Sequence, residues 1–169
     1  MKKLALVALL GLAMPAIAQN DPKQAPSIVE DASKVGVGKT FAADALAAAR
    51  KDARLVVVAF SEADCPLSKL YRPKIERLSK EYAEKGVRFL LVATDDKVFG
   101  PLLEPTRTTE AFLLDAENVL RYRGAIDDQY GIGYHRDEAT KNYLTDAIAA
   151  LLDSKAPPVA ATEAPGCRV

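Results

Sequence analysis

The chain has 169 residues, 49% of them hydrophobic and 27% charged, and its 23 basic residues balance its 23 acidic ones. This length predicts one globular domain, and the balanced charge provides no basic excess that would favour nucleic acid as a partner. Two cysteines and one histidine are too few for a four-ligand zinc site built from these residue types, or for a motif with two histidines.

The first eighteen residues have the pattern of a secretory signal peptide. Lys2 and Lys3 precede an apolar run over residues 4–14, and residues 16–18 read Ala-Ile-Ala, a small-residue cleavage pattern. The apolar run is shorter than the roughly 20 residues that a helix needs to cross a bilayer. We therefore expect cleavage after Ala18, no stable membrane insertion afterwards, and a periplasmic or secreted protein. An uncleaved membrane anchor is the alternative.

The rest of the chain divides into an extension, a domain and a tail. Residues 19–38 are polar and contain prolines and glycines, which is typical of a flexible N-terminal extension. Residues 39–153 carry the periodic hydrophobic patterns of a folded domain. Residues 154–169 are rich in proline and alanine, and they predict a flexible C-terminal tail that carries Cys167.

Hydrophobic patterns within the domain predict an α/β fold. Continuous apolar runs at 55–60 and 87–93 are typical of strands buried on both faces, and the helical spacing between them implies a parallel pair. Two shorter runs around a turn predict an antiparallel hairpin, and the segment before it predicts a loop. The expected result is a central mixed β-sheet flanked by helices. The remaining predicted elements are helices at 41–52, 66–85 and 139–153 and hairpin strands at 110–114 and 119–123.

Cys65 lies where the first predicted strand ends and the second predicted helix begins. Pro66 follows it directly, and proline is favoured in the first turn of a helix. A sulfur at this position faces free backbone N–H groups and the positive end of the helix dipole, and both favour the reactive thiolate. Ser68 can donate a hydrogen bond to the sulfur from the same helical face. We interpret Cys65 as a reactive thiol rather than an inert buried one.

The segment from Phe60 to Pro73 resembles the active-site segment of the thioredoxin superfamily. An aromatic residue five positions before Cys65, a lysine at Lys69 and a proline eight positions after the cysteine all match. Residues 112–115 and 120–128 are similar to exported redoxins grouped with the alkyl hydroperoxide reductase and thiol-specific antioxidant proteins. The resemblance covers about residues 40–153. It implies a thioredoxin-like fold and thiol-based oxidoreduction of a disulfide or peroxide, with Cys65 as nucleophile.

Several diagnostic positions of that superfamily carry other residues in this chain. Ser68 replaces the second cysteine of the Cys-x-x-Cys motif, and Thr109 stands where a cis-proline is expected. Glu62 occupies a position where peroxidatic members carry threonine, and Ser61 one where copper-delivering relatives carry cysteine. These departures leave open which of the superfamily's reactions the chain performs.

Cys167 is the internal candidate for a second redox thiol. A single thiol that attacks a disulfide or peroxide needs a second thiol to resolve its product. An extended tail from Asp153 to Cys167 could reach roughly 45 Å, and the domain's radius of gyration should be about 15 Å. We hypothesise that Cys65 and Cys167 form a reversible disulfide. Pairing of Cys167 with another molecule is the alternative.

These assignments define the expected partners. The substrates would be exported protein thiols or disulfides, or a peroxide, and a separate reductant would restore the thiols. One alternative is a copper-binding or copper-delivery protein that uses Cys65, His135 and Cys167, because thiolate and imidazole both suit copper. Another is a thioredoxin-like binding module without catalysis. Apart from copper in that alternative, we expect no cofactor.

Three other features have both a functional and an ordinary interpretation. Arg107 could stabilise a thiolate or a bound anion, or be an ordinary surface arginine. Asp127 and Asp128 could form an acid/base pair, although adjacent acids after a strand more often form a solvated turn or a helix cap. His135, in a predicted glycine-rich loop, could be a copper ligand or a surface residue of that loop.

Overall fold

The structure is a computed structural model of the chain and describes residues 25–169; the signal peptide predicted at residues 1–18 lies outside the described residues. The described strands are β1 (Leu55–Phe60), β2 (Val87–Val92), β3 (Ala111–Leu114), β4 (Leu120–Gly124), β5 (Tyr130–Gly131) and β6 (Tyr134–His135). The described helices are the 3-10 helix η2 (Ala32–Val35) and the α-helices α1 (Ala43–Arg50), α2 (Pro66–Ala83), α3 (Phe99–Leu103) and α4 (Tyr143–Leu152).

The central sheet has four strands in the order β2-β1-β3-β4. The strands β1 and β2 run parallel, with Leu55 opposite Val87, and α2 connects them. The strand β3 pairs antiparallel with both β1 and β4. The prediction of a central mixed sheet flanked by helices is therefore confirmed, including its parallel pair and its hairpin.

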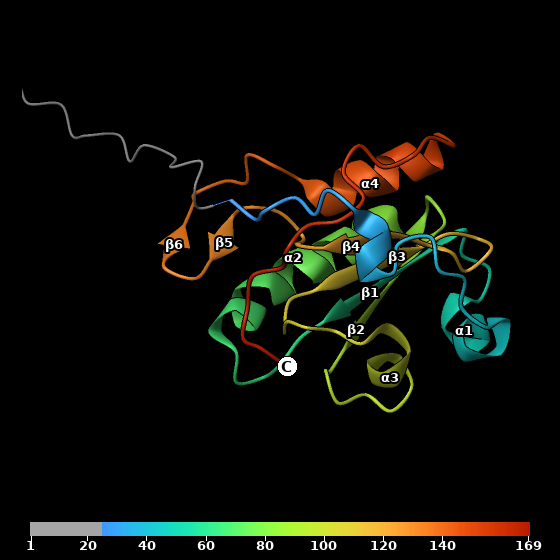
Figure 1. Cartoon of the computed structure of the whole chain (residues 1–169), viewed down its shortest axis with the longest axis horizontal. Helices are drawn as coiled ribbons and strands as arrows, with labels where there is room; N and C mark the ends of the chain where they lie inside the picture. The colour runs from blue at the N-terminus through green and yellow to red at the C-terminus, as the bar shows by residue number, and fades with distance from the viewer. Residues whose placement is uncertain (1–24) are drawn as a thin grey trace, which may run out of the picture.

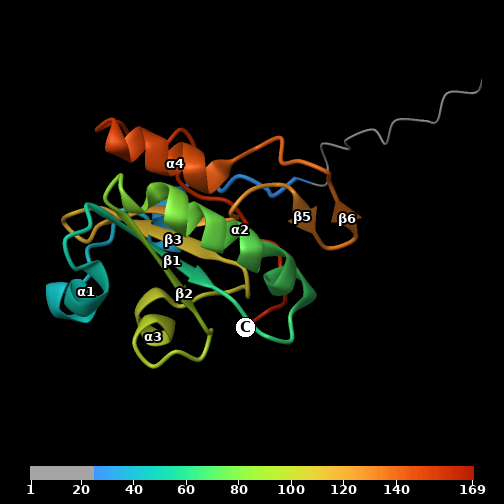
Figure 2. The ribbon, with the colours of Figure 1, turned by 180° about the vertical axis from the view of Figure 1, so that it is seen from behind.

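Helices cover both faces of this sheet (Figures 1 and 2). Successive side chains of a strand point to opposite faces, so Val57 packs in one core cluster and Val58 in the other. The first cluster includes Ile75 of α2 and Ile148 of α4, whereas the second includes Leu46 of α1. Because both faces are covered, every residue of β1 is buried, which explains its continuous apolar sequence.

The last helix is shorter than the segment predicted at 139–153. It begins at Tyr143, because the backbone N–H groups of Thr140 and Lys141 donate to the carboxylate of Asp128 instead of starting a helix. The helix predicted at 41–52 is also shorter at both ends, and α1 spans Ala43–Arg50.

Two segments predicted as loops contain regular structure. The helix α3 forms before β3, where Asp96 accepts hydrogen bonds from the N–H groups of Val98 and Phe99. Leu103 at its end is buried in the core beneath the sheet. The glycine-rich segment around His135 contains the two-residue strands β5 and β6. Both segments contain glycine or proline, which favour loops, so the sequence did not predict the helix or the two strands.

The C-terminal tail is not the flexible segment predicted from its composition. The edge strand β4 offers unpaired backbone groups, and the tail pairs with them: Arg123 N–H donates to Ala160, and Thr162 N–H donates to Arg123. The side chain of Thr162 is buried beside this edge. The edge of the sheet thus holds the tail and directs it towards the carboxyl end of β1, as Figure 1 shows in red.

The N-terminal extension also departs from the prediction where the structure describes it. Ile28 forms a β-bridge with Thr162 of the tail, and Val29 N–H donates to Ala161. Gly38 N–H donates to Leu120 at the start of β4. Both ends of the described chain therefore pack along the same edge of the domain.

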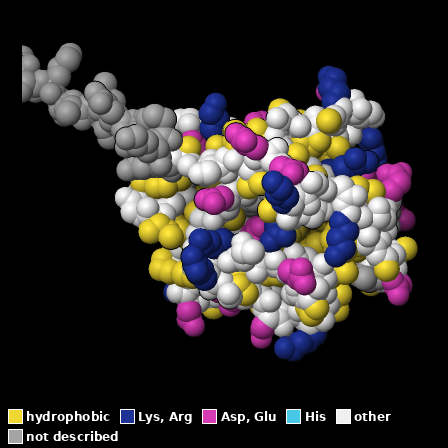
Figure 3. Space-filling view, viewed as in Figure 1, with side chains coloured by type: hydrophobic (Ala, Val, Ile, Leu, Met, Phe, Trp, Pro, Cys, Tyr) yellow, Lys and Arg dark blue, Asp and Glu magenta, His cyan; other side chains and the backbone are white. Residues whose placement is uncertain are grey.

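Basic and acidic side chains are interspersed on the face seen in Figure 3, with no large region of one charge. This face is consistent with the balanced composition of the chain. Within residues 25–169, no helix combines the length and apolar character needed to cross a bilayer.

Candidate functional site

Cys65 is the residue that caps the N-terminus of α2, and Pro66 is the first residue of that helix. The sequence had placed both at this junction. Cys65 is only 3% exposed, and the backbone N–H of Ser68, in the first turn of α2, helps to lower the pKa of its thiol. The helix start therefore favours the thiolate, as the position of Cys65 predicts.

Thr108 provides the donor that sequence reasoning missed. Its hydroxyl donates to Cys65 Sγ at 2.9 Å and accepts the backbone N–H of Cys167 at 3.1 Å. The backbone N–H of Thr108 also donates to the carbonyl of Cys167 at 3.1 Å. One buried threonine thus contacts the thiol of Cys65 and holds the end of the tail beside it.

The two cysteines lie together. Cys167 Sγ donates to Cys65 Sγ at a distance of 3.3 Å, although 102 positions separate the residues in sequence. Both are free thiols, with Cys65 buried and Cys167 exposed. The structure therefore brings together the pair that the sequence singled out, in the reduced form and within reach of bond formation.

The surroundings of the two sulfurs shift their pKa values in opposite directions. Burial raises the pKa of Cys65, but hydrogen bonds from the Thr108 hydroxyl and from Ser68 and Cys167 outweigh it and lower the pKa to about 6. The hydrogen bond to Cys65 raises the pKa of Cys167. At neutral pH, Cys65 is thus a thiolate and Cys167 a neutral thiol that donates to it.

Ser68 does not play the part predicted for its side chain. Its hydroxyl donates to the carbonyl of Thr108 at 3.0 Å and accepts the backbone N–H of Glu62 at 3.1 Å. The side chain therefore ties the segment containing Thr108 to the start of α2. Ser68 positions the donor rather than acting as one.

Thr109 and Arg107 flank the threonine that contacts Cys65. Thr109 stands at the predicted cis-proline position, is buried, and donates from its hydroxyl to the carbonyl of Pro165 in the tail. Arg107 is half-buried and forms a β-bridge with Arg168. Both residues therefore bond to the tail beside Cys167, whereas the hydrogen bond to the Cys65 sulfur comes from Thr108 between them.

The structure does not bring His135 to the cysteines. Its exposed ring stacks on Tyr130, with the ring centroids 5.2 Å apart. The strand β6, which carries His135, lies apart from the C-terminus in both Figures 1 and 2. Among residues 25–169, no three His, Cys, Asp or Glu side chains group as a metal site would require. The predicted ligand set of Cys65, His135 and Cys167 is therefore not assembled.

Comparisons with known proteins establish the fold alone. A hypothetical protein from Sinorhizobium meliloti superposes with a TM-score of 0.59 at 23% identity, over 73% of this chain and 82% of that one. An uncharacterized conserved protein from Geobacillus kaustophilus superposes with the same TM-score at 22% identity, over 71% of this chain and 78% of that one. No family model and no curated protein matches the chain.

Gly166 directly precedes Cys167 and lies against Thr108 and Thr109. Its φ of 121° disfavours any residue with a Cβ, and a Cβ there would lie 2.9 Å from Thr108 Oγ1 and 3.1 Å from Thr109 Oγ1. We expect Gly166→Ala to displace Cys167 and to slow formation of a Cys65–Cys167 disulfide by about tenfold or more. The rate can be followed by quenching with an alkylating reagent and measuring intact mass.

Gly133→Ala is a matched control for this variant. Gly133 also has a positive φ, of 81°, but a Cβ there would meet no atom within 4 Å. Its substitution also places a Cβ on a residue with positive φ, but without a collision near the sulfurs. Equal disulfide-formation rates in the two variants would contradict the role assigned to Gly166.

Asp127 and Asp128 do not form a solvated turn, because both side chains are buried. Asp127 accepts hydrogen bonds from the hydroxyl of Tyr71 at 2.9 Å and from Lys74. Burial raises the pKa of Asp128, but its hydrogen bonds from Thr140 and the neighbouring N–H groups outweigh this and lower it. Each carboxylate is thus used to hold the segment between β4 and α4.

Removing the Asp127 carboxylate should therefore destabilise the fold without removing any hydrogen bond to Cys65 or Cys167. We expect Asp127→Ala to lower the free energy of unfolding by roughly 2–4 kcal/mol, because Tyr71 and Lys74 lose a buried partner. Urea denaturation measures the change. Asp153→Ala, on an exposed carboxylate, is the control and should change stability by less than about 0.5 kcal/mol. Equal effects of both variants would contradict this assignment.

Proposed function

We propose that this protein is an exported, thioredoxin-like thiol oxidoreductase in which Cys65 and Cys167 alternate between two thiols and one disulfide. The observation that carries the proposal is the 3.3 Å separation of the two sulfurs, with Cys65 stabilised as a thiolate and Cys167 as a thiol. Because the thiolate is the attacking form, these charge states favour Cys65 as the first nucleophile and leave Cys167 for the second step, after it loses its proton.

The fold and the amino-terminal sequence support the other parts of the proposal. The parallel β1–β2 pair joined by α2, the β3–β4 hairpin, and a cysteine at the start of α2 agree with the resemblance of residues 60–73 to the thioredoxin superfamily. The pattern of residues 1–18 favours export, and an exported protein meets an oxidising environment in which two thiols can cycle.

The chemistry begins at Cys65 and ends with both sulfurs bonded. With a disulfide substrate, the Cys65 thiolate attacks one substrate sulfur, the substrate S–S bond breaks, and the leaving thiolate takes a proton from solvent. Cys167, once deprotonated, then attacks Cys65 Sγ and releases the second substrate thiol. The substrate gains two electrons from the protein and two protons, one equivalent to the proton that Cys167 loses and one from solvent, as the Cys65–Cys167 disulfide forms.

A peroxide substrate follows the same two stages. The Cys65 thiolate attacks one peroxide oxygen, the O–O bond breaks, and the departing alkoxide or hydroxide takes a proton from solvent. The Cys65 sulfenic acid then reacts with the Cys167 thiol, forming the disulfide and releasing water. Because the tail covers Cys65, a small peroxide reaches the sulfur more easily than a folded protein disulfide does.

Titration of the reduced full-length protein tests the proposal. One equivalent of hydrogen peroxide, or of the disulfide of 2-mercaptoethanol, should lower the intact mass by two hydrogen atoms within one chain. Peptide mapping should then join the peptides containing Cys65 and Cys167. Cys65→Ser should abolish this product. Two free thiols after treatment, or a disulfide between two chains, would overturn the proposal.

A further inference from the structure

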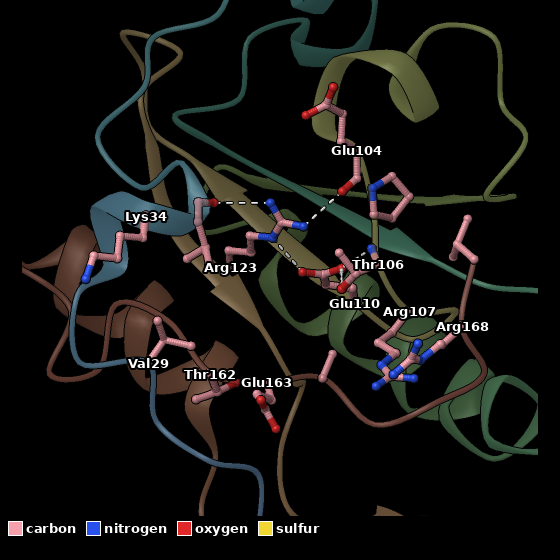
Figure 4. Close-up of a pocket in the computed structure, with 14 residues that line it drawn as sticks. Val29, Lys34, Glu104, Thr106, Arg107, Glu110, Arg123, Thr162, Glu163 and Arg168 are labelled. Atoms are coloured by element: carbon pink, nitrogen blue, oxygen red, sulfur yellow. Dashed lines mark hydrogen bonds and ion pairs between the residues drawn. The ribbon is translucent and has the colours of Figure 1, made fainter.

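A cavity of about 720 Å³ lies along the C-terminal tail. Figure 4 shows its lining, in which side chains of the tail face those of the N-terminal segment, of β4 and of the segment before β3. This volume is in the range of small-molecule sites in proteins. Neither Cys65 nor Cys167 belongs to the lining, so the cavity is separate from the disulfide site.

Arg107 and Arg168 stand directly opposite each other at one end of the cavity (Figure 4). The backbone N–H groups of Thr108 and Val169 donate across the bridge on either side of them, so the arginines form the non-hydrogen-bonded pair of an antiparallel bridge. The Cα atoms of such a pair lie about 4.5 Å apart, and both side chains leave the same face. The side chains of Thr108 and Cys167, one position along, leave the opposite face.

The charge of this pair has no partner within residues 25–169. Neither guanidinium donates a hydrogen bond there, and no carboxylate, the chain terminus included, lies within 4.0 Å of either. Glu104 and Glu163 also line the cavity, but Figure 4 shows both away from the pair. By contrast, Arg123 of the same lining donates from its Nε to Glu110 at 2.6 Å. Because like charges directly opposite each other destabilise a β-pair, this end of the cavity favours an anion.

A compact dianion suits this end of the cavity better than a single carboxylate does. The pair carries two positive charges, and a phosphate monoester carries about 1.5 to 2 negative charges at pH 7 on oxygens that accept from both guanidinium forks. The cavity is larger than a phosphate group alone would fill. Several of its other lining residues are apolar and suit an apolar body on the same ligand, namely Val29, Val35, Pro105, Ala164 and Val169.

The tail itself forms one wall of the cavity. Thr162, Glu163 and Ala164 line one stretch of that wall, and Arg168 and Val169 line another. The cavity is therefore complete only while the tail lies on the domain. A ligand that binds the docked tail, and not the lifted one, stabilises the docked form by mass action.

We propose that this cavity binds a small phosphate monoester with an apolar body, and that the ligand locks the end of the tail onto the domain. Arg107 belongs to the segment before β3 and Arg168 to the tail, so one phosphate group bonds to both sides of the bridge. The binding is independent of the disulfide cycle. Its consequence for that cycle rests on the proposed function: the same bridge holds the backbone of Cys167 against Thr108, so a locked tail keeps the two sulfurs together.

Calorimetric titration of the reduced full-length protein with phenyl phosphate, in low salt at about pH 7.5, tests the binding site. Benzoate has the same ring but one charge and should bind at least about fivefold more weakly. We expect Arg107→Gln/Arg168→Gln to weaken phenyl phosphate binding by at least about tenfold. Arg77→Gln/Lys80→Gln, on the exposed face of α2, removes the same charge and should change the affinity by less than about twofold. No binding, equal affinities of the wild-type protein and the double arginine variant, or equal affinities for the two ligands would overturn the proposal.

Hydrogen exchange of the same reduced protein tests the locking of the tail. The backbone N–H groups of Thr108 and Val169 donate across the bridge, so they exchange when the end of the tail lifts. With phenyl phosphate at about ten times its Kd, their exchange should slow about tenfold in the wild-type protein and not in the double arginine variant. Unchanged exchange in the ligand-bound wild-type protein would overturn the lock. Failure of the proposed function is seen separately, as the absence of an intramolecular disulfide after oxidation without any phosphate ester.

Discussion

Replacing Cys167 with serine is expected to stop turnover while preserving the first chemical step. The Cys65 thiolate keeps the hydrogen bond from Thr108 and its place at the start of α2, so it still attacks an oxidised substrate. Without a second sulfur, the product on Cys65 cannot be resolved within the chain. Steady-state activity with a peroxide or disulfide should therefore fall to background, and one equivalent of substrate should remain trapped on Cys65.

Intact-mass spectrometry after a single addition of substrate distinguishes the two stages. The Cys167→Ser protein should carry a sulfenic acid or a mixed disulfide on Cys65, whereas the wild-type protein should carry neither. Cys65→Ser is the matched control and should show no adduct at low substrate concentration, because the pKa of Cys167 is raised. Full turnover by Cys167→Ser would contradict the assignment of Cys167 as the resolving thiol.

Removing the hydroxyl of Thr108 is expected to raise the pKa of Cys65 by about one to two pH units, because a hydrogen bond to a charged group is typically worth about 1.5–3 kcal/mol. The thiolate fraction at pH 6.5 should then fall several-fold in Thr108→Val, and the rate of alkylation of Cys65 should fall with it. Measuring that rate from pH 4 to pH 10 gives the pKa directly. Thr108→Ser retains a hydroxyl and should restore a value close to 6.

The same pKa shift makes the stability of the reduced protein depend on pH. The pKa of Cys65 is lower in the folded protein than in the unfolded chain, so its thiolate stabilises the fold fully above about pH 8.5. This contribution is lost as the pH falls through about 6. The stability difference between wild-type protein and Thr108→Val should therefore shrink as the pH is lowered to 5. A difference that stays constant over this range would contradict the assigned donor.

Local patterns predicted most of the fold. The strand at 55–60 and the start of the second helix at Pro66 were correctly placed, because continuous apolar runs and helical spacing depend on nearby residues. The start of the last helix was predicted too early, since Asp128, which lies in an earlier segment, captures the N–H groups of Thr140 and Lys141. Such competition between distant groups leaves no periodic signal.

The site residues also differ in whether local sequence could reveal them. Cys65 could be found because its position before Pro66 is a local feature, and Cys167 because it is the other cysteine of the chain. Thr108 could not, since its contact with Cys65 depends on how β3 lies beside β1. The composition of the tail predicted flexibility, whereas free backbone groups on β4 hold it in place. The composition of a segment indicates how much apolar surface it can bury, but it does not show whether a strand elsewhere in the chain has free backbone groups with which the segment can pair.

The wide separation of the two cysteines in sequence has a consequence for the whole molecule. A bond between Cys65 and Cys167 would close a loop of about one hundred residues that contains α2, the strands β2 to β6 and α4. In the chain-entropy description, closing a loop of that length restricts the unfolded chain by about 4–5 kcal/mol. Oxidation would then tether the far end of the polypeptide to its centre, so that the redox state of one sulfur pair would also set how long the folded chain persists.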